Sequence, residues 1–584
     1  MEGQAFRKRF PLKYSWIFLF LACLVLWVMF YSESITDHIT CRLSEMSVPT
    51  TKAPTLSTTR FKRPTEPPEP ASVCSYHSVL PEDALEVELL KESIAWPETP
   101  SLPSDFSLND TSDPAHSTFT ILPRNGGGSW RVGDQLEVLI QITDFQGRPK
   151  SSGGDVLLAR LHNSTLFAGV AGRVLDHHNG SYTAVFALLW EGSAHVEVTL
   201  VHPSEAVTVL ERITQQNPDR VSFKSIFRFG SVTEATACNM CLKAPPEKLC
   251  NFTDIRTGEP WFCYKPKKLK CEHRIIHSFG GFGLKLKPME EKLFQRDVNL
   301  KVLIQSSGTS NITILPKLKV LNEMVPTNTS GGSVNIQPAG YYYQGIWRAL
   351  DGATVHQLTN NSAISQCLSG QVLHLYGDST IRQWFEYLIS AAPDLKKFDL
   401  KSLQQTGPFM ALNYAKNTLV TFRCHAPPIR FGNLPISQTR YIANELDGVA
   451  GGEKTTIVIG VWSHFSTFPV EVYIRRLLSI RRAVGRLLTR APGTLVIIRT
   501  ANPKALTLYE TLTNSDWFSI QRDKILRTIF KGMNVRFVDA WEMTLAHHLP
   551  HNLHPQHPII SNMLNVVLSH ICSPAGNFEK ATKL

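Results

Sequence analysis

Concentrated charge, internal repeats and nucleotide-binding signatures are all absent from this chain of 584 residues. Lys and Arg exceed Asp and Glu by 60 to 49, a net charge of +11, but the basic residues are spread along the sequence. Without a basic cluster we expect no nucleic-acid partner, whereas a modest affinity for acidic glycans or membrane surfaces is compatible with this charge. The length predicts two or three separate cores.

Apolar runs long enough to cross a bilayer are also scarce, and the one candidate is Tyr14–Tyr31, which holds no charged residue. Its 18 residues are near the minimum for a spanning helix. The basic residues Arg7, Lys8, Arg9 and Lys13 precede it, and no small-residue cleavage site follows. We therefore expect residues 1–31 to be a cytosolic tail and a type II signal anchor of a Golgi-type membrane protein. A cleaved signal peptide, which would give a secreted protein, is the alternative.

Two residue types favour a luminal location for the remainder of the chain. Ten of the eleven cysteines follow the apolar run, in a compartment where disulfides persist. N-x-S/T glycosylation motifs occur at Asn109, Asn163, Asn179, Asn251, Asn311, Asn328 and Asn360. All of these motifs precede Ser379, so the C-terminal region is predicted to carry no N-linked glycan.

The first half of the chain divides by composition. Residues 32–115 are predicted to be a flexible stem, because Pro49–Pro70 is rich in Thr and Pro and cannot bury a core. Residues 116–230 hold short alternating runs, such as Gln135–Ile142 and His195–His202, separated by Gly-rich turns. This pattern predicts an antiparallel sandwich of immunoglobulin-like size.

Residues 231–275 form a cysteine-rich region with five members: Cys238, Cys241, Cys250, Cys263 and Cys271. The Cys238-x-x-Cys241 pair is compatible with zinc, but the other three cysteines do not form a second such pair. Disulfides are therefore favoured over a metal site. Because five is odd, one cysteine either pairs outside the region, for instance with Cys74, or stays free.

Residues 276–365 are interpreted as a connecting region, and residues 366–574 alternate between strand and helix patterns. The predicted strands are Gln371–Tyr376, Thr455–Val461, Thr494–Arg499 and Val535–Asp539. The predicted helices are Thr380–Ile389, Pro469–Thr489, Asp516–Phe530 and Asn562–Ile571. Apolar strands separated by helices predict a parallel sheet covered on both faces.

The most informative segment is Val372–Gln383, where an apolar strand ends at Gly377-Asp378-Ser379 and a helix follows. This layout puts the Ser379 hydroxyl at the carboxyl end of a buried strand, where reactive groups of α/β sheets usually lie. A serine at this position is also a favoured helix N-cap, and Asp378 is a common turn residue. The tripeptide alone therefore supports both a nucleophile and a simple turn.

Several longer motifs resemble one protein family. The segments Tyr376–Trp384, Val538–Trp541 and His554-Pro555 resemble the PC-esterase branch of the SGNH hydrolases. The segments Gly153–Asp155, Val201–Glu205 and Cys250–Asp254 resemble the neurexophilin-like part of the same two-part proteins. The chain thus resembles the neurexophilin and PC-esterase domain (NXPE) family.

This resemblance implies a three-layer α/β esterase fold and O-acyl chemistry on carbohydrates. Ser379 would be the nucleophile and His554 the general base, because a serine hydroxyl attacks well only when a base takes its proton. The N–H groups of Ser379 and the next residue would hold the oxyanion. Four neighbouring residues are predicted to line the site, namely Gly377, Asp378, Arg382 and His464; the alternatives are a helix salt bridge for Arg382 and a core histidine for His464.

Two positions depart from the family pattern. The related hydrolases usually carry an aspartate three residues before the histidine, where it orients the imidazole, and this chain has His551 at that position. Asp539 would take over this role only if the loop between Asp539 and His554 folded back. Wider relatives carry an asparagine in the oxyanion hole where this chain has Val461. The loss of such a donor typically lowers the rate by about a hundredfold to a thousandfold. The histidines around His554 also raise a metal alternative, but their spacing in a Pro-broken loop is poor ligand geometry.

The leading hypothesis is a luminal enzyme that moves an acetyl or similar acyl group to or from hydroxyl groups of glycoprotein glycans. We expect no bound cofactor or metal, although transfer would require an activated donor such as acetyl-CoA. The alternative is a neurexophilin-like binding glycoprotein with a receptor partner and a degenerate esterase domain, since fold alone does not establish function.

Overall fold

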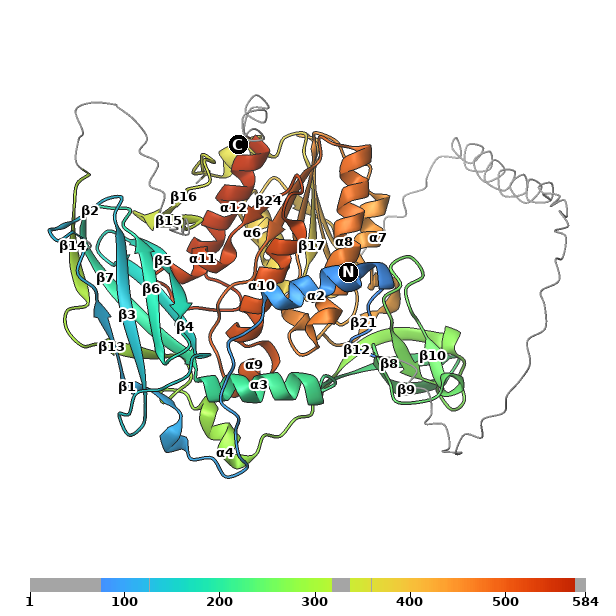
Figure 1. Cartoon of the computed structure of the whole chain (residues 1–584). Helices are drawn as coiled ribbons and strands as arrows, with labels where there is room; N and C mark the ends of the chain where they lie inside the picture. Colours follow the sequence, from blue (N-terminus) through green and yellow to red (C-terminus); the bar gives the residue numbers. More distant parts are fainter. Residues whose placement is uncertain (1–74, 125, 318–336, 359, 573–584) are drawn as a thin grey trace, which may run out of the picture. The chain divides into compact units, whose positions relative to one another are not determined.

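The computed structural model describes residues 75–124, 126–317, 337–358 and 360–572, all within one compact unit (Figure 1). The predicted anchor, the Thr/Pro-rich tract and Asn328 lie outside the described residues. None of the described helices is both long and apolar enough to span a bilayer.

Residues 75–115, which we expected to belong to the stem, are folded instead. They contain two 3₁₀ turns, Pro81–Asp83 and Leu108–Asp110, and the helix α2 (Ala84–Ser93). Helix α2 lies across α8 (Val470–Arg490) and α10 (Asp516–Phe530) and buries Val87 and Leu90. Glu86 Oε2 accepts a hydrogen bond from Arg481 at 2.7 Å. The stem prediction is therefore wrong for this segment, because an apolar stripe of α2 packs on the main core.

The N-terminal region is rich in β-structure, and seven of its strands close into a ring (Figure 1). In the order of pairing around the ring these are β1 (Ser112–Ile121), β3 (Gln135–Asp144), β6 (Ser181–Ala187), β5 (Ala168–Asp176), β4 (Val156–Asn163), β7 (Gly192–His202) and β13 (Val302–Ser306). Strand β5 closes one edge by pairing with both β4 and β6, and β1 closes the other by pairing with β3 and β13. The predicted open two-sheet sandwich is therefore corrected to a closed ring.

The ring also draws on residues that we assigned to a connecting region. Strand β13 completes the ring, and β14 (Asn311–Leu315), β15 (Gly340–Tyr343) and β16 (Ile346–Ala349) extend its edges together with β2 (Trp130–Arg131). The strands enclose one apolar core that includes Val138, Val170 and Val198. The predicted boundary at residue 230 is therefore wrong, because a core of strands 116–230 alone would lack one side.

The cysteine-rich region forms a six-stranded sheet next to the helix α3 (Ser204–Gln216). Its strands are β8 (Val221–Phe229), β9 (Val232–Asn239), β10 (Leu249–Asn251), β11 (Phe262–Tyr264), β12 (Arg274–Phe282) and β21 (Leu434–Pro435), with 3₁₀ turns at Pro246–Lys248 and Cys271–His273. The short helix α4 (Pro288–Glu291) and a 3₁₀ turn (Lys292–Phe294) follow. Disulfides join Cys238 to Cys263 and Cys250 to Cys271, and Cys241 is disulfide-bonded as well. The disulfide prediction is thus confirmed for this region.

The C-terminal region is α/β, as predicted, with a seven-stranded sheet. The sheet order is β18 (Lys396–Lys397), β19 (Phe409–Asn413), β20 (Thr418–Cys424), β17 (Val372–Gly377), β22 (Thr455–Gly460), β23 (Leu495–Arg499) and β24 (Arg536–Val538). The last five strands run parallel, and β18 and β19 form an antiparallel edge. All four predicted strands are present to within a few residues.

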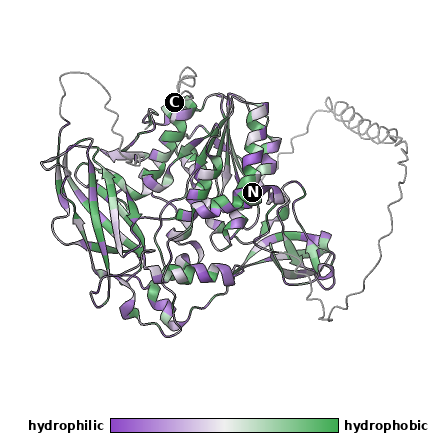
Figure 2. Cartoon of the chain, viewed as in Figure 1, coloured by the Kyte–Doolittle hydropathy of each residue, from purple (hydrophilic) through white to green (hydrophobic). Residues whose placement is uncertain are grey.

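Helices cover both faces of this sheet. One face packs α7 (Ile442–Gly448), α8 and α10, and the other packs α6 (Ser379–Ala391) and α12 (His557–Cys572). The remaining helices are α5 (Asn361–Cys367), α9 (Leu508–Asn514) and α11 (Ala540–Leu545), with 3₁₀ turns at Ile436–Gln438 and Ser463–Phe465. Figure 2 shows apolar residues throughout the parallel strands, as expected for a sheet buried on both faces. A third disulfide, Cys367–Cys572, joins α5 to the end of α12.

Candidate active site at the carboxyl edge of the parallel sheet

Polar residues follow the parallel strands at the edge of the sheet where those strands end. Asp378 and Ser379 follow β17, His425 follows β20, Ser463 and His464 follow β22, and Asn502 follows β23. The carboxyl ends of parallel strands meet at one edge, so these side chains converge although they are far apart in sequence.

The structure brings Ser379 and His554 together at this edge. Ser379 is the first residue of α6, and its Oγ lies 2.8 Å from Nε2 of His554, which belongs to the loop between α11 and α12. Ser379 is only 6% exposed, and His554 is half-buried. The distance is that of a hydrogen bond, so the imidazole is placed to take the hydroxyl proton.

Gly377 has a packing role at the site. A Cβ atom at this position would lie 2.0 Å from the carbonyl oxygen of Gly460 on the neighbouring strand. The carbonyl of Gly377 also accepts a hydrogen bond from the N–H of His425 at 3.1 Å. Only glycine therefore allows β17 and β22 to approach this closely just before Ser379. Strand packing therefore accounts for glycine at position 377, and the substrate contact that we predicted for Gly377 is not needed to explain it.

Asp378 is fully buried and fixes the turn that presents Ser379. Its Oδ1 accepts hydrogen bonds from the N–H and Oγ1 of Thr380 at 2.9 and 2.7 Å, and it therefore caps α6. Its Oδ2 accepts from Oγ of Ser463 at 3.2 Å. Burial alone would raise the pKa of Asp378, but His464 and the hydrogen bonds from Thr380 outweigh burial and hold that pKa below its usual range. A buried carboxylate thus lies directly beside the nucleophile.

The loop that carries His554 is held by a buried polar clamp. Asn502 Nδ2 donates to the carbonyl of Asn552 at 2.9 Å, and its Oδ1 accepts from Arg499 at 2.7 Å. Gln383, on α6, donates to the carbonyl of Pro555 at 2.7 Å. Arg499 and Asn502 are both completely buried. The sequence interpretation missed these residues, although their polar types directly after an apolar strand were a usable signal.

The environment keeps His554 neutral at pH 7. Burial lowers the pKa of His554, Arg382 and Arg499 lower it further, and Asp378 opposes them. A neutral imidazole is the form that accepts a proton from serine. The electrostatics therefore suit a general base rather than a permanent cation.

Neither candidate acid orients this imidazole. Asp539 Oδ2 accepts from Arg527 at 2.7 Å and its Oδ1 caps α11 through the N–H of Glu542, so the predicted catalytic role of Asp539 is wrong. His551 lies near Lys301 and Asp516, and burial lowers its pKa to about 3. Within the described ranges, no carboxylate accepts a hydrogen bond from Nδ1 of His554.

The predicted oxyanion donors differ in availability. The N–H of Thr380 is committed to Asp378, which corrects the expectation that it would bind the oxyanion. Val461 is buried and offers no side-chain donor. The N–H of Ser379 has no acceptor among the residues that the structure describes. One backbone donor therefore remains at the nucleophile.

The other predicted site residues have partners of their own. Arg382 forms an i,i+4 ion pair with Glu386 at 2.9 Å, which is the alternative that we left open. His464 is buried, and its Nδ1 lies 3.0 Å from Nε2 of His425, whose Nδ1 faces the carbonyl of Ala426 at 2.6 Å. A carbonyl only accepts, so His425 donates from Nδ1 and accepts from His464. His464 thus belongs to a buried histidine pair behind Asp378.

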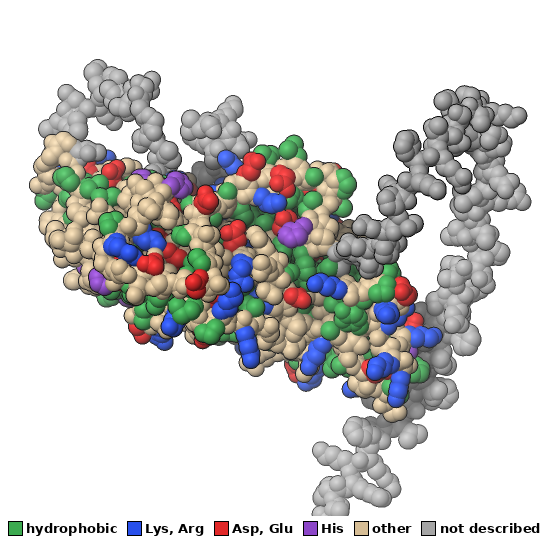
Figure 3. Space-filling view, turned by 60° about the horizontal axis from the view of Figure 1, so that its bottom comes forward, with side chains coloured by type: hydrophobic (Ala, Val, Ile, Leu, Met, Phe, Trp, Pro, Cys, Tyr) green, Lys and Arg blue, Asp and Glu red, His purple; other side chains and the backbone are tan. Residues whose placement is uncertain are grey.

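The predicted glycosylation sites that the structure describes do not contribute to this edge. Asn109, Asn179, Asn251, Asn311 and Asn360 are exposed, whereas Asn163 is half-buried and donates to the carbonyl of Ser193 at 2.7 Å. Across the described parts of the chain, no group of three or more His, Cys, Asp or Glu residues has the arrangement of a metal site. Figure 3 shows basic and acidic side chains interspersed on one face of the molecule.

Comparison with known proteins agrees with this two-part architecture. Residues 97–297 match the family model described as neurexophilin, and residues 347–572 match the model described as NXPE family member 4-like, C-terminal domain. Among solved structures, the chain is similar to an active site mutant of a family two carbohydrate esterase from Clostridium thermocellum, at 8% identity and a TM-score of 0.20 over 79% of this chain and 96% of that one. That likeness is too low to support an argument. The two family matches together show that the chain belongs to the NXPE family.

Proposed function

We propose that the C-terminal domain forms or cleaves O-acyl esters, in particular O-acetyl esters, on hydroxyl groups of glycoprotein glycans. The observation that carries this proposal is the 2.8 Å contact between Ser379 Oγ and His554 Nε2 at the carboxyl edge of a parallel sheet. A helix N-terminus points at the same atom, which favours the negative charge that develops during acyl transfer.

The chemistry proceeds in two balanced halves. In the first, Ser379 Oγ bonds to the acyl carbon while its proton passes to His554 Nε2, and the departing alcohol or thiol takes that proton. In the second, water or a sugar hydroxyl attacks the acyl carbon and gives its proton to His554. The bond between the acyl carbon and Ser379 Oγ breaks, His554 returns the proton to Oγ, and the free acid or the sugar ester leaves. Transfer to a sugar requires an activated donor such as acetyl-CoA, whereas attack by water gives an esterase.

The surrounding residues set the efficiency of this pair. Asp378 fixes the serine turn through Thr380 and Ser463, and Asn502 fixes the histidine loop. No acid among the residues that the structure describes bonds the imidazole, so we expect a Ser–His dyad that is slower than a complete triad. The low exposure of Ser379 favours a small acyl group and limits the access of water to the acyl-serine, which favours transfer over hydrolysis.

The same proposal places the domain in the lumen of the secretory pathway, behind the predicted type II anchor. The three described disulfides and the exposed N-x-S/T motifs support this location.

A fluorophosphonate probe tests the proposal directly, because it reacts with activated serines. The full chain, expressed in a secretory host, should be labelled at Ser379, and Ser379→Ala and His554→Ala should each abolish the labelling. Ser307→Ala and His177→Ala are matched controls, because both residues lie in the N-terminal region and contact hydroxyl partners there. An absence of labelling in a folded, glycosylated chain would refute the enzyme.

Two observations favour a second candidate, a binding glycoprotein. Ser379 is nearly buried, and the position of the usual orienting acid is occupied by His551. If labelling fails, the folded chain would instead present the N-terminal ring and the disulfide-bonded sheet to a receptor. Capture of a cell-surface receptor by the Ser379→Ala chain, with unchanged affinity, would support that alternative.

A further inference from the structure

A cavity of about 560 Å³ lies between the N-terminal ring and the helices α10 and α11 of the C-terminal region. Strands β4, β5 and β6 form one wall, and the segment Ile94–Pro97, which follows α2, closes one side. Neither Ser379 nor His554 lines it. Its volume is in the range of small-molecule sites, which occur preferentially at boundaries between domains.

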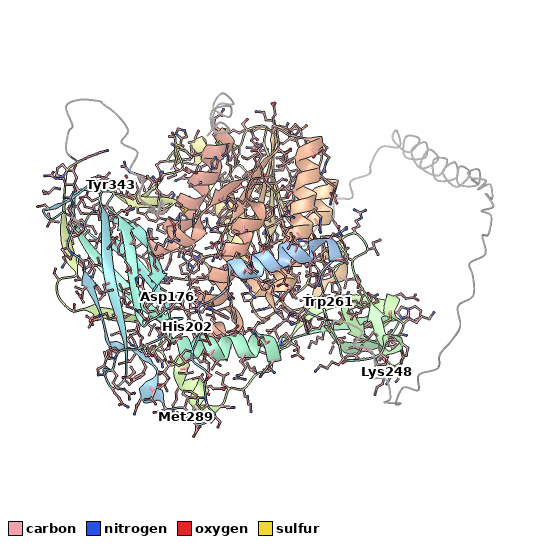
Figure 4. All side chains as sticks on the ribbon, viewed as in Figure 1. Asp176, His202, Lys248, Trp261, Met289 and Tyr343 are labelled. Atoms are coloured by element: carbon pink, nitrogen blue, oxygen red, sulfur yellow. A yellow bond between two sulfur atoms is a disulfide. The ribbon has the colours of Figure 1, made fainter. Side chains whose placement is uncertain are left out.

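Two exposed cations line this cavity from opposite walls, Arg173 on β5 and Lys524 on α10. Neither side chain forms an ion pair or a hydrogen bond with any other residue in the described ranges. By contrast, the Asp176 carboxylate (labelled in Figure 4) already accepts hydrogen bonds from the N–H groups of Gly154 and His178, both at 2.8 Å. Arg173 and Lys524 are therefore the charged side chains of the cavity that lack a partner in the described ranges, whereas the charged Asp176 is already hydrogen-bonded.

Of the other two carboxyl groups of the cavity, Glu542 is mostly neutral at pH 7 and Asp155 is about half ionised. Burial, followed by the nearby Asp539, raises the pKa of Glu542 to about 8. Burial and Glu205 raise the pKa of Asp155 to about 7. At pH 7 Glu542 is thus mostly neutral and holds a proton that it can donate to a ligand oxygen.

Aromatic surface completes the lining. Trp96 and Trp541 are both half-buried at the cavity. Trp96 is held in place, because its indole N–H donates to the carbonyl of Gly154 at 2.8 Å and its ring packs edge-to-face on Trp517. Indole surface beside planar amide, carboxyl and guanidinium groups suits a ligand that has both apolar C–H faces and many hydroxyls.

We propose that this cavity is an accessory binding site for an acidic oligosaccharide, with the ligand carboxylate between Arg173 and Lys524 and its sugar rings against the tryptophans. The choice of a carbohydrate rests on the function proposed above, but the binding itself requires no turnover. Helix α11 forms part of the cavity and leads directly into the His554 loop, and the N–H of Trp541 donates to Thr500 Oγ1 at 3.3 Å. A glycoprotein chain bound here would thus be held near the catalytic edge.

Calorimetric titration of the full chain carrying Ser379→Ala tests this site without consuming the ligand. The probes are 3′-sialyllactose, which carries a carboxylate, and lactose, which does not. We expect the acidic sugar to bind, and the double change Arg173→Ala with Lys524→Ala to weaken its binding at least about tenfold. The matched control is Arg348→Ala with Lys531→Ala, which removes the same charge from exposed positions outside the cavity.

A second variant, which changes no charge, distinguishes binding in the cavity from a long-range electrostatic effect of the double change. Gln521→Trp introduces an indole into the cavity from the surface of α10 and should also reduce binding. No binding of the acidic sugar, or equal binding by the parent and the double variant, would overturn the site. Fluorophosphonate labelling of Ser379 is independent of these titrations, so failure of the cavity and failure of the enzyme are distinguishable.

Discussion

The buried clamp on the histidine loop gives a sharp prediction, because Asn502 touches neither reactive group. Asn502→Ala removes the hydrogen bonds to Arg499 and to the carbonyl of Asn552, at 2.7 and 2.9 Å. It leaves a buried guanidinium donor unpaired and frees the carbonyl of the exposed residue Asn552. An orphaned buried group costs about 1–3 kcal/mol, so we expect a loss of about 1–3 kcal/mol in the free energy of unfolding from the Arg499 donor.

The effect on reactivity should exceed what this loss of stability explains. His554 is two residues from Asn552, so release of that carbonyl lets the imidazole move relative to Ser379. A displacement of about 1 Å typically costs about a hundredfold in rate. We therefore expect fluorophosphonate labelling of Ser379 to slow about a hundredfold in Asn502→Ala, at a temperature where the variant remains folded.

Asn565→Ala is the matched control for this experiment. Asn565 is also buried, and its side chain bonds Gln357 at 3.0 Å and the N–H of Leu358 at 3.2 Å, away from the histidine loop. Its melting temperature should fall similarly, while its labelling rate should stay near that of the parent. Equal labelling rates in the two variants would show that Asn502 does not position the base.

Three further predictions concern charge. Burial lowers the pKa of His554, so the rate of Ser379 labelling should remain at its maximum as the pH falls to 6.5 and should drop only at lower pH, where the imidazole becomes protonated. Asp378→Asn should move the midpoint of this drop to still lower pH, because Asp378 raises the pKa of His554. A midpoint above pH 6.5 would contradict His554 as the base. His551→Asp should give no gain in rate, because His551 lies among Lys301 and Asp516, whereas an acid that reached the imidazole would raise the rate by up to about 10⁴-fold. Glu259→Gln should cost about 3–5 kcal/mol in a denaturant titration, because Arg476, 1% exposed, loses its carboxylate partner; a loss below 1 kcal/mol would refute the buried pair.

The sequence predicted the α/β half well because its signals are local. Each predicted strand is an apolar run bounded by turns, and β17 and β22 are buried on both faces, as their composition requires. The Gly-Asp-Ser turn placed Ser379 correctly, since the same three residues set the strand end, the cap and the helix start. Strands β19 and β20 were missed, because their alternating pattern does not stand out from the loops around them.

The N-terminal half was predicted less well because its closure depends on distant pairings. Nothing in Val302–Ser306 indicates that this segment pairs in parallel with β1, almost 190 residues earlier. Likewise, α2 looked like part of a stem, because the Thr/Pro-rich tract before it dominates the composition. The apolar side chains of α2 are buried only because α2 packs on α8 and α10, and the sequence of α2 alone does not indicate this contact.

The same reasoning explains why the catalytic acid was assigned wrongly. Asp539 ends a predicted strand, and from sequence it is the acid nearest to His554 at the right edge of the sheet. In the structure Arg527, from α10, takes that carboxylate, a pairing that only the packing of α10 beside β24 reveals. The carboxylate that does influence His554 is Asp378, which the sequence presents as a turn residue.

The two halves of the family architecture meet at the histidine loop, and this changes how the competing functions relate. Arg160 of β4 donates to the carbonyl of His547 at 2.7 Å, and Gly169 of β5 lies so close to α11 that an added Cβ would meet the Ala546 carbonyl oxygen at 2.1 Å. The ring therefore packs on the segment that positions His554. A ligand that displaced the ring would therefore displace this segment as well, so we expect ligand binding at the N-terminal half to change the rate of Ser379 labelling.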